Sequence, residues 1–344
     1  MKLLTPPSTV GELEELLSRP TPYLIEALRN LHGDILVLGA GGKMGPSLAV
    51  MARRASDMAG VKRRVMAASR FGAQGTRDYL IQAGVEVFPC DLLDDHGLAA
   101  LPDAENIVFM AGMKFGASEQ TAMTWAMNVW LPGLVCRRYP TSRMAVFSTG
   151  NIYGLTPLSH DGSKEEDPPN PQGEYAMSTL GRERMFEYFS RTQGMPQSVI
   201  RLNYACDLRY GVLVDIALKV LEERPVSLAM ACLNTIWQGD ANAMALASLA
   251  YAETPPLILN ITGPRVLRVR EIAERFGRRF GKTPVFMDEE GTDALLSDSG
   301  RARSLFGPTQ VDEDLLMDWV ADWLLHDGPL LNKPTHFESR DGRF

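Results

Sequence analysis

A short run rich in aliphatic residues, Asp34–Leu38, leads directly into a glycine-rich turn, and the turn opens a helical pattern. The turn reads Gly-Ala-Gly-Gly-Lys-Met-Gly over residues 39–45, which places glycines at its first, fourth and seventh positions. The first glycine permits a tight turn, the second lets the backbone approach a phosphate, and the third lets the helix pack closely on the strand. Because the N-terminus of a helix attracts anions, this unit predicts a binding site for the pyrophosphate of a dinucleotide.

Five further short runs rich in β-branched and aliphatic residues follow, and longer helical patterns separate them. They predict strands over residues 64–68, 85–88, 106–110, 144–147 and 198–202. This alternation is typical of an α/β fold in which a doubly wound parallel sheet of the Rossmann type carries helices on both faces.

The patterns divide the chain into three parts. Residues 1–32 hold two short helical patterns, the first of which begins with Thr9 and Glu12 spaced as in a capping box, and we expect them to form an extension outside the sheet. Residues 33–205 form the predicted dinucleotide-binding domain. Residues 206–344 are less regular and are assigned mostly to a smaller α/β domain that covers the substrate, although the helix predicted over 240–252 is expected to return to the first domain.

Composition excludes several classes of function. The formal net charge is -7 and the basic residues are scattered, which argues against a nucleic-acid partner. No run approaches the roughly 18 apolar residues of a membrane helix, and no signal-peptide core precedes Pro6, so we expect no membrane span and a cytoplasmic protein. The cysteines and histidines are isolated from one another, so we expect reduced thiols and no metal site.

The end of the second predicted strand bears on the choice of cofactor. An NAD site usually places Asp or Glu there to bind the ribose 2′-hydroxyl, but this strand ends in Ser69 and Arg70. The guanidinium of Arg70, together with Ser69 and with Lys43 of the glycine turn, suits a 2′-phosphate. The sequence therefore favours NADP over NAD. The alternative is that Arg70 stacks on the adenine or faces solvent.

Further motifs follow the glycine turn. They are Cys90-Asp91-Leu92, Phe109-Met-Ala-Gly-Met113, Asn128-Val129, Phe147-Ser-Thr-Gly-Asn-Ile-Tyr-Gly154 and Tyr175-Ala-Met-Ser-Thr-Leu-Gly-Arg-Glu183. In this order they resemble the extended short-chain dehydrogenase/reductase family, and within it the NAD-dependent epimerase/dehydratase group, over residues 33–285. The resemblance implies that Asp91 and Leu92 contact the adenine. It implies a cofactor site that also includes Gly39, Gly42, Lys43, Met44, Gly45, Ser69, Arg70, Met110, Ala111, Gly112 and Tyr175.

The same resemblance implies roles for the catalytic residues, and at one position this chain differs from the family. Tyr175 corresponds to the general acid/base, Thr149 to the group that binds the reacting oxygen, and Asn128 to a support of the proton path. The family has a lysine where this chain has Thr179, and without that cation the tyrosine is expected to be a weaker base at neutral pH. Arg182 lies seven residues after Tyr175, on nearly the same helix face, and is the candidate to supply the missing charge. The alternatives are a solvated arginine and a tyrosine that only packs.

Substrate clues are mostly negative. Gly150 and Asn151 follow Thr149, in place of the Asp-Glu pair of the family's dehydratases, and neither Leu233 nor Asn234 supplies an arginine for a diphosphate. A nucleotide-sugar dehydratase is therefore disfavoured, and a small polar substrate with a hydroxyl or carbonyl carbon, such as a sugar, is expected. The candidate substrate-contacting residues are Met113, Lys114, Thr149, Asn151, Asn203 and Arg209.

Two functional hypotheses remain open. The leading one is an NADP- or NAD-dependent oxidoreductase or epimerase-type enzyme. The second, which Thr179 favours, is a sensor or scaffold that binds NAD(P) with reduced catalysis. A homodimer through the helices that start near Ser118 and Tyr175 is compatible with the sequence, although a buried helix would show the same apolar content.

Overall fold

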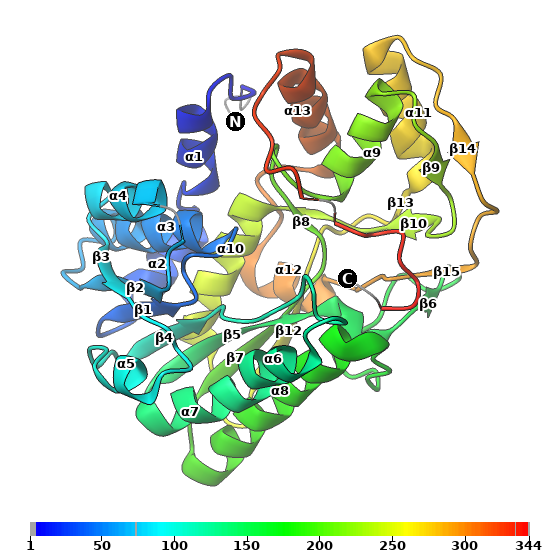
Figure 1. The fold of residues 1–344 in the computed structure, drawn as a ribbon. Coiled ribbons are helices and arrows are strands. Elements are labelled where there is room, and N and C mark those ends of the chain that lie inside the picture. Colours follow the sequence, from blue (N-terminus) through cyan, green and yellow to red (C-terminus); the bar gives the residue numbers. More distant parts are fainter. Residues whose placement is uncertain (1–4, 73, 334, 343–344) are drawn as a thin grey trace.

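A computed structural model describes residues 5–72, 74–333 and 335–342 and shows a seven-stranded sheet (Figure 1). Its strands lie in the order β12-β7-β5-β4-β1-β2-β3, and all neighbouring pairs are parallel. The strands are β1 (Ile35–Leu38), β2 (Val65–Ser69), β3 (Glu86–Pro89), β4 (Asn106–Phe109), β5 (Arg143–Thr149), β7 (Gln197–Leu202) and β12 (Leu257–Ile261). The order reverses between β1 and β4, and sheets of this kind bind ligands beyond the carboxyl ends of their strands at such a point. The predicted α/β fold class is confirmed.

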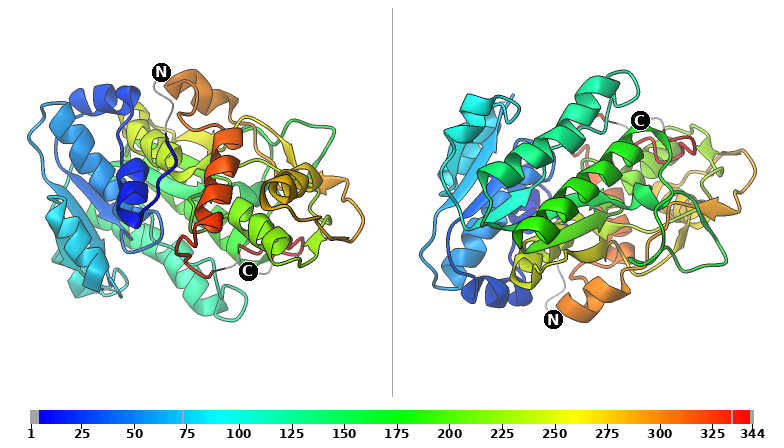
Figure 2. Two further views of the ribbon diagram at one scale, coloured as in Figure 1. Left: turned by 90° about the horizontal axis from the view of Figure 1, so that it is seen from above. Right: turned by 90° about the horizontal axis from the view of Figure 1, so that it is seen from below.

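Helices cover both faces of the sheet (Figure 2). In β1, Ile35 and Val37 share one hydrophobic cluster with α2 (Pro22–Arg29), α3 (Gly45–Met58), α10 (Gln238–Ala247) and α12 (Gly300–Phe306). Leu36 and Leu38 share the opposite cluster with α5 (Asp95–Ala99), α7 (Leu131–Arg138) and α8 (Gly173–Gln193). Burial on both faces explains why these strands are nearly continuous apolar runs.

Six of the seven strands lie within two residues of the predicted ranges, but β12 was missed. It pairs with β7 at one edge of the sheet. Pro255 and Pro256 precede it directly and it contains the polar Asn260, so its sequence looks like an irregular segment. Residues 206–344 therefore supply one strand to the sheet, β12, that the sequence did not predict. They also supply α10, in the region of the helix predicted over 240–252, and α10 packs on α2 and α3.

A third hydrophobic cluster, built mainly from residues after 205, lies beside the sheet. It contains α9 (Val212–Leu221), α11 (Val269–Phe280) and α13 (Glu313–Leu325), and near these helices lie two-residue strand pairs. The pairs are β8 (Ala205–Cys206) with β11 (Ile236–Trp237), β9 (Val226–Ser227) with β14 (Phe286–Met287), β10 (Cys232–Leu233) with β13 (Leu267–Arg268), and β6 (Thr156–Pro157) with β15 (Asp293–Ala294). Helix α1 (Val10–Leu17) buries Leu13 and Leu17 in this cluster, so the N-terminal extension spans both halves of the molecule.

After α13 the chain runs along the third cluster as an irregular segment, residues 328–333 and 335–342, which we call the strap (red in Figure 1). Asp215 of α9 accepts hydrogen bonds from the backbone N–H of Thr335 at 2.8 Å and from its hydroxyl at 2.5 Å. Phe337 is buried in the third cluster, and Arg340 donates to the carbonyl oxygen of Ala229 at 2.8 Å and pairs with Asp293. The strap is thus fixed by buried contacts at several points along its length.

Two negative expectations concern the described residues. None of their helices combines the length and apolarity needed to span a membrane. No group of three or more His, Cys, Asp or Glu side chains among them is arranged to hold a metal ion. The cytoplasmic location stays a prediction.

Candidate functional site

A cavity of about 750 Å³ opens at the carboxyl end of the sheet. Its walls come from the glycine turn, the ends of β4, β5 and β7, the start of α8, residues 202–212 and the strap. Among the predicted site residues, those that line it are Gly39, Gly42, Lys43, Met44, Gly45, Met110, Lys114, Thr149, Asn151, Tyr175, Asn203 and Arg209. Candidate cofactor, catalytic and substrate residues from distant parts of the chain therefore face one space.

The glycine turn has the geometry that its sequence implies. Gly39 has φ +88°, and a Cβ there would lie 2.5 Å from the backbone nitrogen of Ala111, so the turn tolerates no side chain. A Cβ on Gly45 would collide with the backbone of Ala40, whereas one on Gly42 would meet nothing closer than 3.6 Å. Gly42 therefore lies next to open space that a ligand can occupy, whereas Gly39 and Gly45 lie against other backbone. The first backbone N–H groups of α3 receive no side-chain cap from Met44, which fits a phosphate at this helix terminus.

The residues predicted to contact the adenosine part of the cofactor do not line this cavity. Arg70 is exposed at the end of β2 and pairs with no carboxylate in the described part of the chain. The hydroxyl of Ser69 lies next to Gly41, where a Cβ would come within 2.6 Å of it. Asp91 is exposed and accepts from the backbone of Leu93 at 3.0 Å, while Leu92 is buried in a hydrophobic cluster.

A buried polar network holds the loop after β4. Asn128, in a π-helical segment (Ala126–Trp130) between α6 (Thr121–Trp125) and α7, accepts from the N–H of Met113 and donates to its carbonyl oxygen, both at 2.9 Å. It also donates to the hydroxyl of Ser178 on α8 at 2.9 Å. Asn128 thus fixes loop backbone beside the cavity, and π-helical insertions of this kind are frequent at functional sites.

Arg182 completes that network from α8. Arg182 is 5% exposed, and its guanidinium donates to the carbonyl oxygen of Phe147 at 2.8 Å and to Oδ1 of Asn128 at 2.6 Å. Gly112 lies against it, and a Cβ at Gly112 would collide with the guanidinium. Burial lowers the pKa of Arg182 to about 10, so the group stays cationic at neutral pH. Arg182 is therefore a buried cation inside the site and is not a solvated surface arginine.

Tyr175 lies under the influence of this cation. Burial raises the pKa of Tyr175, and the Arg182 charge and the hydroxyls of Thr149 and Thr179 oppose the rise. The Thr179 hydroxyl also donates to the carbonyl oxygen of Tyr175 at 2.8 Å within the helix, so it supplies a hydrogen bond and no charge. Thr149, at the end of β5, donates to Oδ1 of Asn151 at 3.2 Å. The net effect favours a protonated tyrosine beside a threonine hydroxyl.

On the opposite wall, the polar candidates are already engaged. Asn203 is buried and donates to Asn234 and to the carbonyl oxygen of Leu295. Arg209 forms ion pairs with Glu14 of α1 at 2.6 Å and with Asp207 at 3.1 Å. Both side chains line the cavity, and these contacts hold them in place there.

Arg201, near the end of β7, is structural. Its guanidinium pairs with both oxygens of Glu183, at 2.9 and 3.1 Å, and both side chains are almost fully buried. It does not line the cavity.

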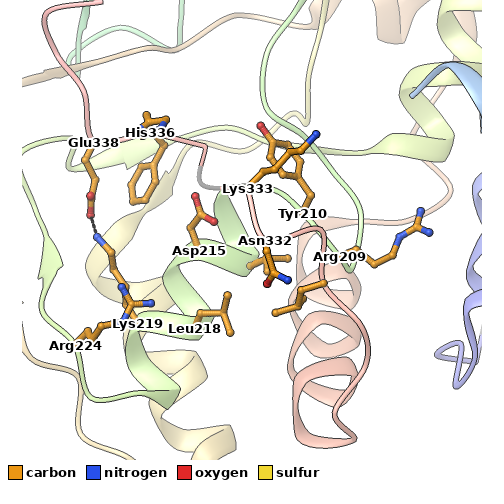
Figure 3. Close-up of a pocket in the computed structure, with 13 residues that line it drawn as sticks. Arg209, Tyr210, Asp215, Leu218, Lys219, Arg224, Asn332, Lys333, His336 and Glu338 are labelled. Carbon is orange, nitrogen blue, oxygen red and sulfur yellow. Dashed lines mark hydrogen bonds and ion pairs between the residues drawn. The ribbon is translucent and has the colours of Figure 1, made fainter. Parts of the chain in front are cut away.

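Sequence reasoning missed the contributions of the two chain ends. Glu14 of α1 and Leu331, Lys333 and Thr335 of the strap line the cavity. A side pocket of about 220 Å³ adjoins it between α9 and the strap and shares Arg209, Tyr210 and Lys333 with it (Figure 3). No local pattern marks these residues, because only the tertiary course of the chain brings them to the site.

Comparisons with known proteins agree with this fold and motif order. Residues 35–205 match the family described as NAD dependent epimerase/dehydratase family. No curated protein matches the sequence. One similar solved structure is the UDP-glucose 4-epimerase of Thermotoga maritima, with TM-score 0.70 and 16% identity over 86% of this chain and 99% of that one.

Two others were solved in complex with NAD. The UDP-glucose 4-epimerase of Thermus thermophilus has TM-score 0.68 and 19% identity over 84% of this chain and 98% of that one. The UDP-glucuronic acid 4-epimerase of Bacillus cereus has TM-score 0.70 and 16% identity over 86% of this chain and 99% of that one. At these identities the likeness establishes a shared fold.

Proposed function

We propose that this chain, which belongs to the NAD-dependent epimerase/dehydratase family through residues 35–205, is an NAD(P)-dependent oxidoreductase or epimerase-type enzyme. One observation carries the proposal. The glycine turn, Thr149 and Tyr175 face a single cavity, with the buried guanidinium of Arg182 behind the tyrosine. This arrangement combines a phosphate-binding turn, a hydroxyl for a reacting oxygen and a proton-exchanging group.

The residues of the glycine turn fit a dinucleotide. Gly42 leaves room for close backbone approach, and the uncapped start of α3 offers N–H groups to a pyrophosphate. A bound nicotinamide would supply hydride acceptance and donation. The exposed guanidinium of Arg70 and the hydroxyl of Ser69 favour NADP, whereas two similar structures were solved with NAD, so both dinucleotides are tested below.

The protein groups divide the remaining work. The Thr149 hydroxyl, which now donates to Asn151, exchanges that partner for the reacting oxygen of the substrate. Tyr175 exchanges its phenolic proton with the same oxygen. Because burial raises the pKa of Tyr175, the tyrosine is a better donor than acceptor of a proton at neutral pH. This favours reduction of a carbonyl over oxidation of a hydroxyl.

Arg182 and Asn128 act as positioning residues. Arg182 does not line the cavity, but its charge lowers the pKa of Tyr175 and so replaces part of the effect of the lysine that Thr179 displaces. Asn128 holds the Arg182 guanidinium and the loop at Met113 together. The hydrogen bond from Arg182 to Asn128 therefore holds the guanidinium in a fixed position behind Tyr175.

The substrate is a small polar molecule. Pockets for one small ligand measure about 300–1,000 Å³. The cavity of about 750 Å³ has to hold part of the dinucleotide as well as the substrate, which leaves space on the scale of a monosaccharide. The polar part of the cavity wall is formed by Asn151, Asn203, Lys114 and Arg209.

We also propose a homodimer. Large apolar side chains are exposed on α6, the π-helical segment and α8, with Trp130 60% and Tyr188 59% exposed. Clusters of this kind commonly mark protein interfaces. Light scattering of the parent protein should give a dimer mass, and Trp130→Glu should give monomers. A monomeric parent would contradict this assignment.

The test of function is a substrate screen by nicotinamide absorbance with the parent, Tyr175→Phe and Thr149→Val. Turnover of a carbonyl or hydroxyl compound that falls at least tenfold in both variants supports the enzyme. The competing sensor hypothesis rests on Thr179, so Thr179→Lys is the discriminating variant. A large gain of turnover in it points to a site that has lost catalysis, and a loss points to a site adapted to threonine.

A further inference from the structure

Lys43 extends from the glycine turn to the opposite wall of the cavity. Its ammonium Nζ donates to the carbonyl oxygen of Ala205 at 3.1 Å and lies 4.3 Å from the centroid of the Tyr210 ring. Both partners follow β7, on the side where substrate candidates gather. Within the described ranges no carboxylate forms an ion pair with this ammonium, so its charge is held by a carbonyl dipole and an aromatic face.

A second lysine brings another positive charge to the same cavity. Nζ of Lys114 lies 5.7 Å from the centroid of the Tyr175 ring. Burial lowers the pKa of Lys43, and burial together with the charge of Lys43 lowers the pKa of Lys114 to about 8. Both lysines line the same cavity, and the positive charge of Lys43 disfavours a positive charge on Lys114. Such an arrangement is costly unless a ligand of opposite charge is bound.

The carboxylates around the cavity are already used. Glu14 and Asp207 both pair with Arg209. Asp215, the carboxylate that acts on Lys114, accepts two hydrogen bonds from Thr335 of the strap. Figure 3 shows Asp215 on α9 facing the strap, near the paired Lys219 and Glu338. The wall thus presents more positive than negative charge to a bound molecule.

We propose that the substrate carries an acidic group, a carboxylate or a phosphate, and that Lys43 and Lys114 bind this group while Thr149 and Tyr175 face the reacting carbon. This inference rests on the proposed function, because it assumes that the substrate occupies the cavity beside a bound dinucleotide. It narrows the substrate from a small polar molecule to an acid such as a sugar acid or a sugar phosphate. An anion there cancels the repulsion between the amines and raises the fraction of Lys114 that is charged.

The pyrophosphate of the dinucleotide is the competing anion. Two features favour the substrate. The Lys43 ammonium lies at Ala205 and Tyr210, away from the backbone of the turn, and that backbone already offers the uncapped N–H groups of α3 to a pyrophosphate. The experiment separates the two possibilities by measuring both affinities.

The full chain is first titrated calorimetrically with NAD and NADP and then saturated with whichever binds. The loaded protein is titrated with D-glucuronate, D-glucose 6-phosphate and D-glucose, which share one ring and differ in the acidic group. We expect at least one acid to bind tenfold or more tightly than glucose. In Lys43→Met and Lys114→Met this ratio should fall at least fivefold, and in Lys43→Arg, which keeps the charge, it should largely persist.

Lys62→Met, at an exposed lysine outside the cavity, is the matched control and should keep the parent's ratio. Circular dichroism and melting temperature establish that each variant is folded, and Lys43→Arg keeps the test decisive if a methionine variant is not. A loaded protein that binds neither acid more tightly than glucose overturns the proposal. So does an acid preference that survives both methionine substitutions while dinucleotide affinity falls, because the amines then serve the cofactor. Failure to bind either dinucleotide instead contradicts the proposed function.

Discussion

Arg182→Leu removes the cation that we place behind Tyr175, and its consequences can be worked out from the contacts. The guanidinium makes two buried hydrogen bonds, to the carbonyl oxygen of Phe147 at 2.8 Å and to Asn128 at 2.6 Å. Hydrogen bonds to a charged group contribute about 1.5–3 kcal/mol each, so the two are worth about 3–6 kcal/mol. The variant leaves both acceptors without this donor.

The cost of burying the guanidinium offsets part of that loss. Burial lowers the pKa of Arg182 from 12.5 to about 10, which corresponds to about 3 kcal/mol of disfavoured charge. We therefore expect Arg182→Leu to lower the free energy of unfolding by up to about 3 kcal/mol. Loss of the cation should also raise the pKa of Tyr175 further, because only the threonine hydroxyls then oppose the effect of burial.

Two assays check these expectations. Urea unfolding gives the change in stability, and the ultraviolet difference titration of the parent against Tyr175→Phe, repeated in the Arg182→Leu background, isolates the Tyr175 phenol. Arg184→Leu is the matched control, because Arg184 lies on the same helix, is more than half exposed and pairs only at the surface with Glu187. It should cost less than about 1 kcal/mol and leave the titration of Tyr175 unchanged. An Arg182→Leu protein with the stability and tyrosine titration of the parent would refute the assigned role.

Three further predictions test other parts of the structure. Burial raises the pKa of Asp240 from 3.8 to about 6, so its protonated form stabilises the fold below about pH 4 and this contribution is lost as the pH rises through 6. Relative to the parent, Asp240→Asn should therefore gain up to about 3 kcal/mol in urea unfolding between about pH 4 and pH 7, and a difference that does not vary with pH contradicts this. Gly42→Val should leave the melting temperature within a few degrees, since a Cβ there meets nothing closer than 3.6 Å, yet weaken dinucleotide binding at least tenfold; unchanged binding would show that the turn does not approach the phosphate. Glu183→Gln should cost about 3–5 kcal/mol because it leaves the buried Arg201 charge without its partner, whereas Glu86→Gln at an exposed pair should cost less than about 1 kcal/mol, and equal costs would count against the buried pair.

The sequence predicts the central sheet well because the relevant signals are local. Short apolar runs buried on both faces define β1 and its neighbours, and the spacing of Gly39, Gly42 and Gly45 defines the turn that follows. The local sequence pattern does not predict the edge strand β12, because two prolines precede it and Asn260 interrupts its apolar run. Its pairing with β7 depends on the tertiary course of the chain.

The candidate site is predictable in part. Motif order locates Thr149, Tyr175 and Asn128, and helical periodicity places Arg182 near Tyr175. The burial of Arg182 cannot be read from periodicity, because it depends on Gly112, whose missing side chain leaves room for the guanidinium. The strap and Glu14 of α1 lie far from the motifs in sequence, and only the folded chain brings them to the cavity.

The most direct test of the central claim is calorimetric titration of the purified protein with NAD, NADP and their reduced forms, together with Arg70→Ala. We predict saturable binding of at least one dinucleotide, and a weaker affinity for NADP in Arg70→Ala if the exposed guanidinium receives a 2′-phosphate. Absence of binding to all four would contradict the claim that this site holds a nicotinamide dinucleotide.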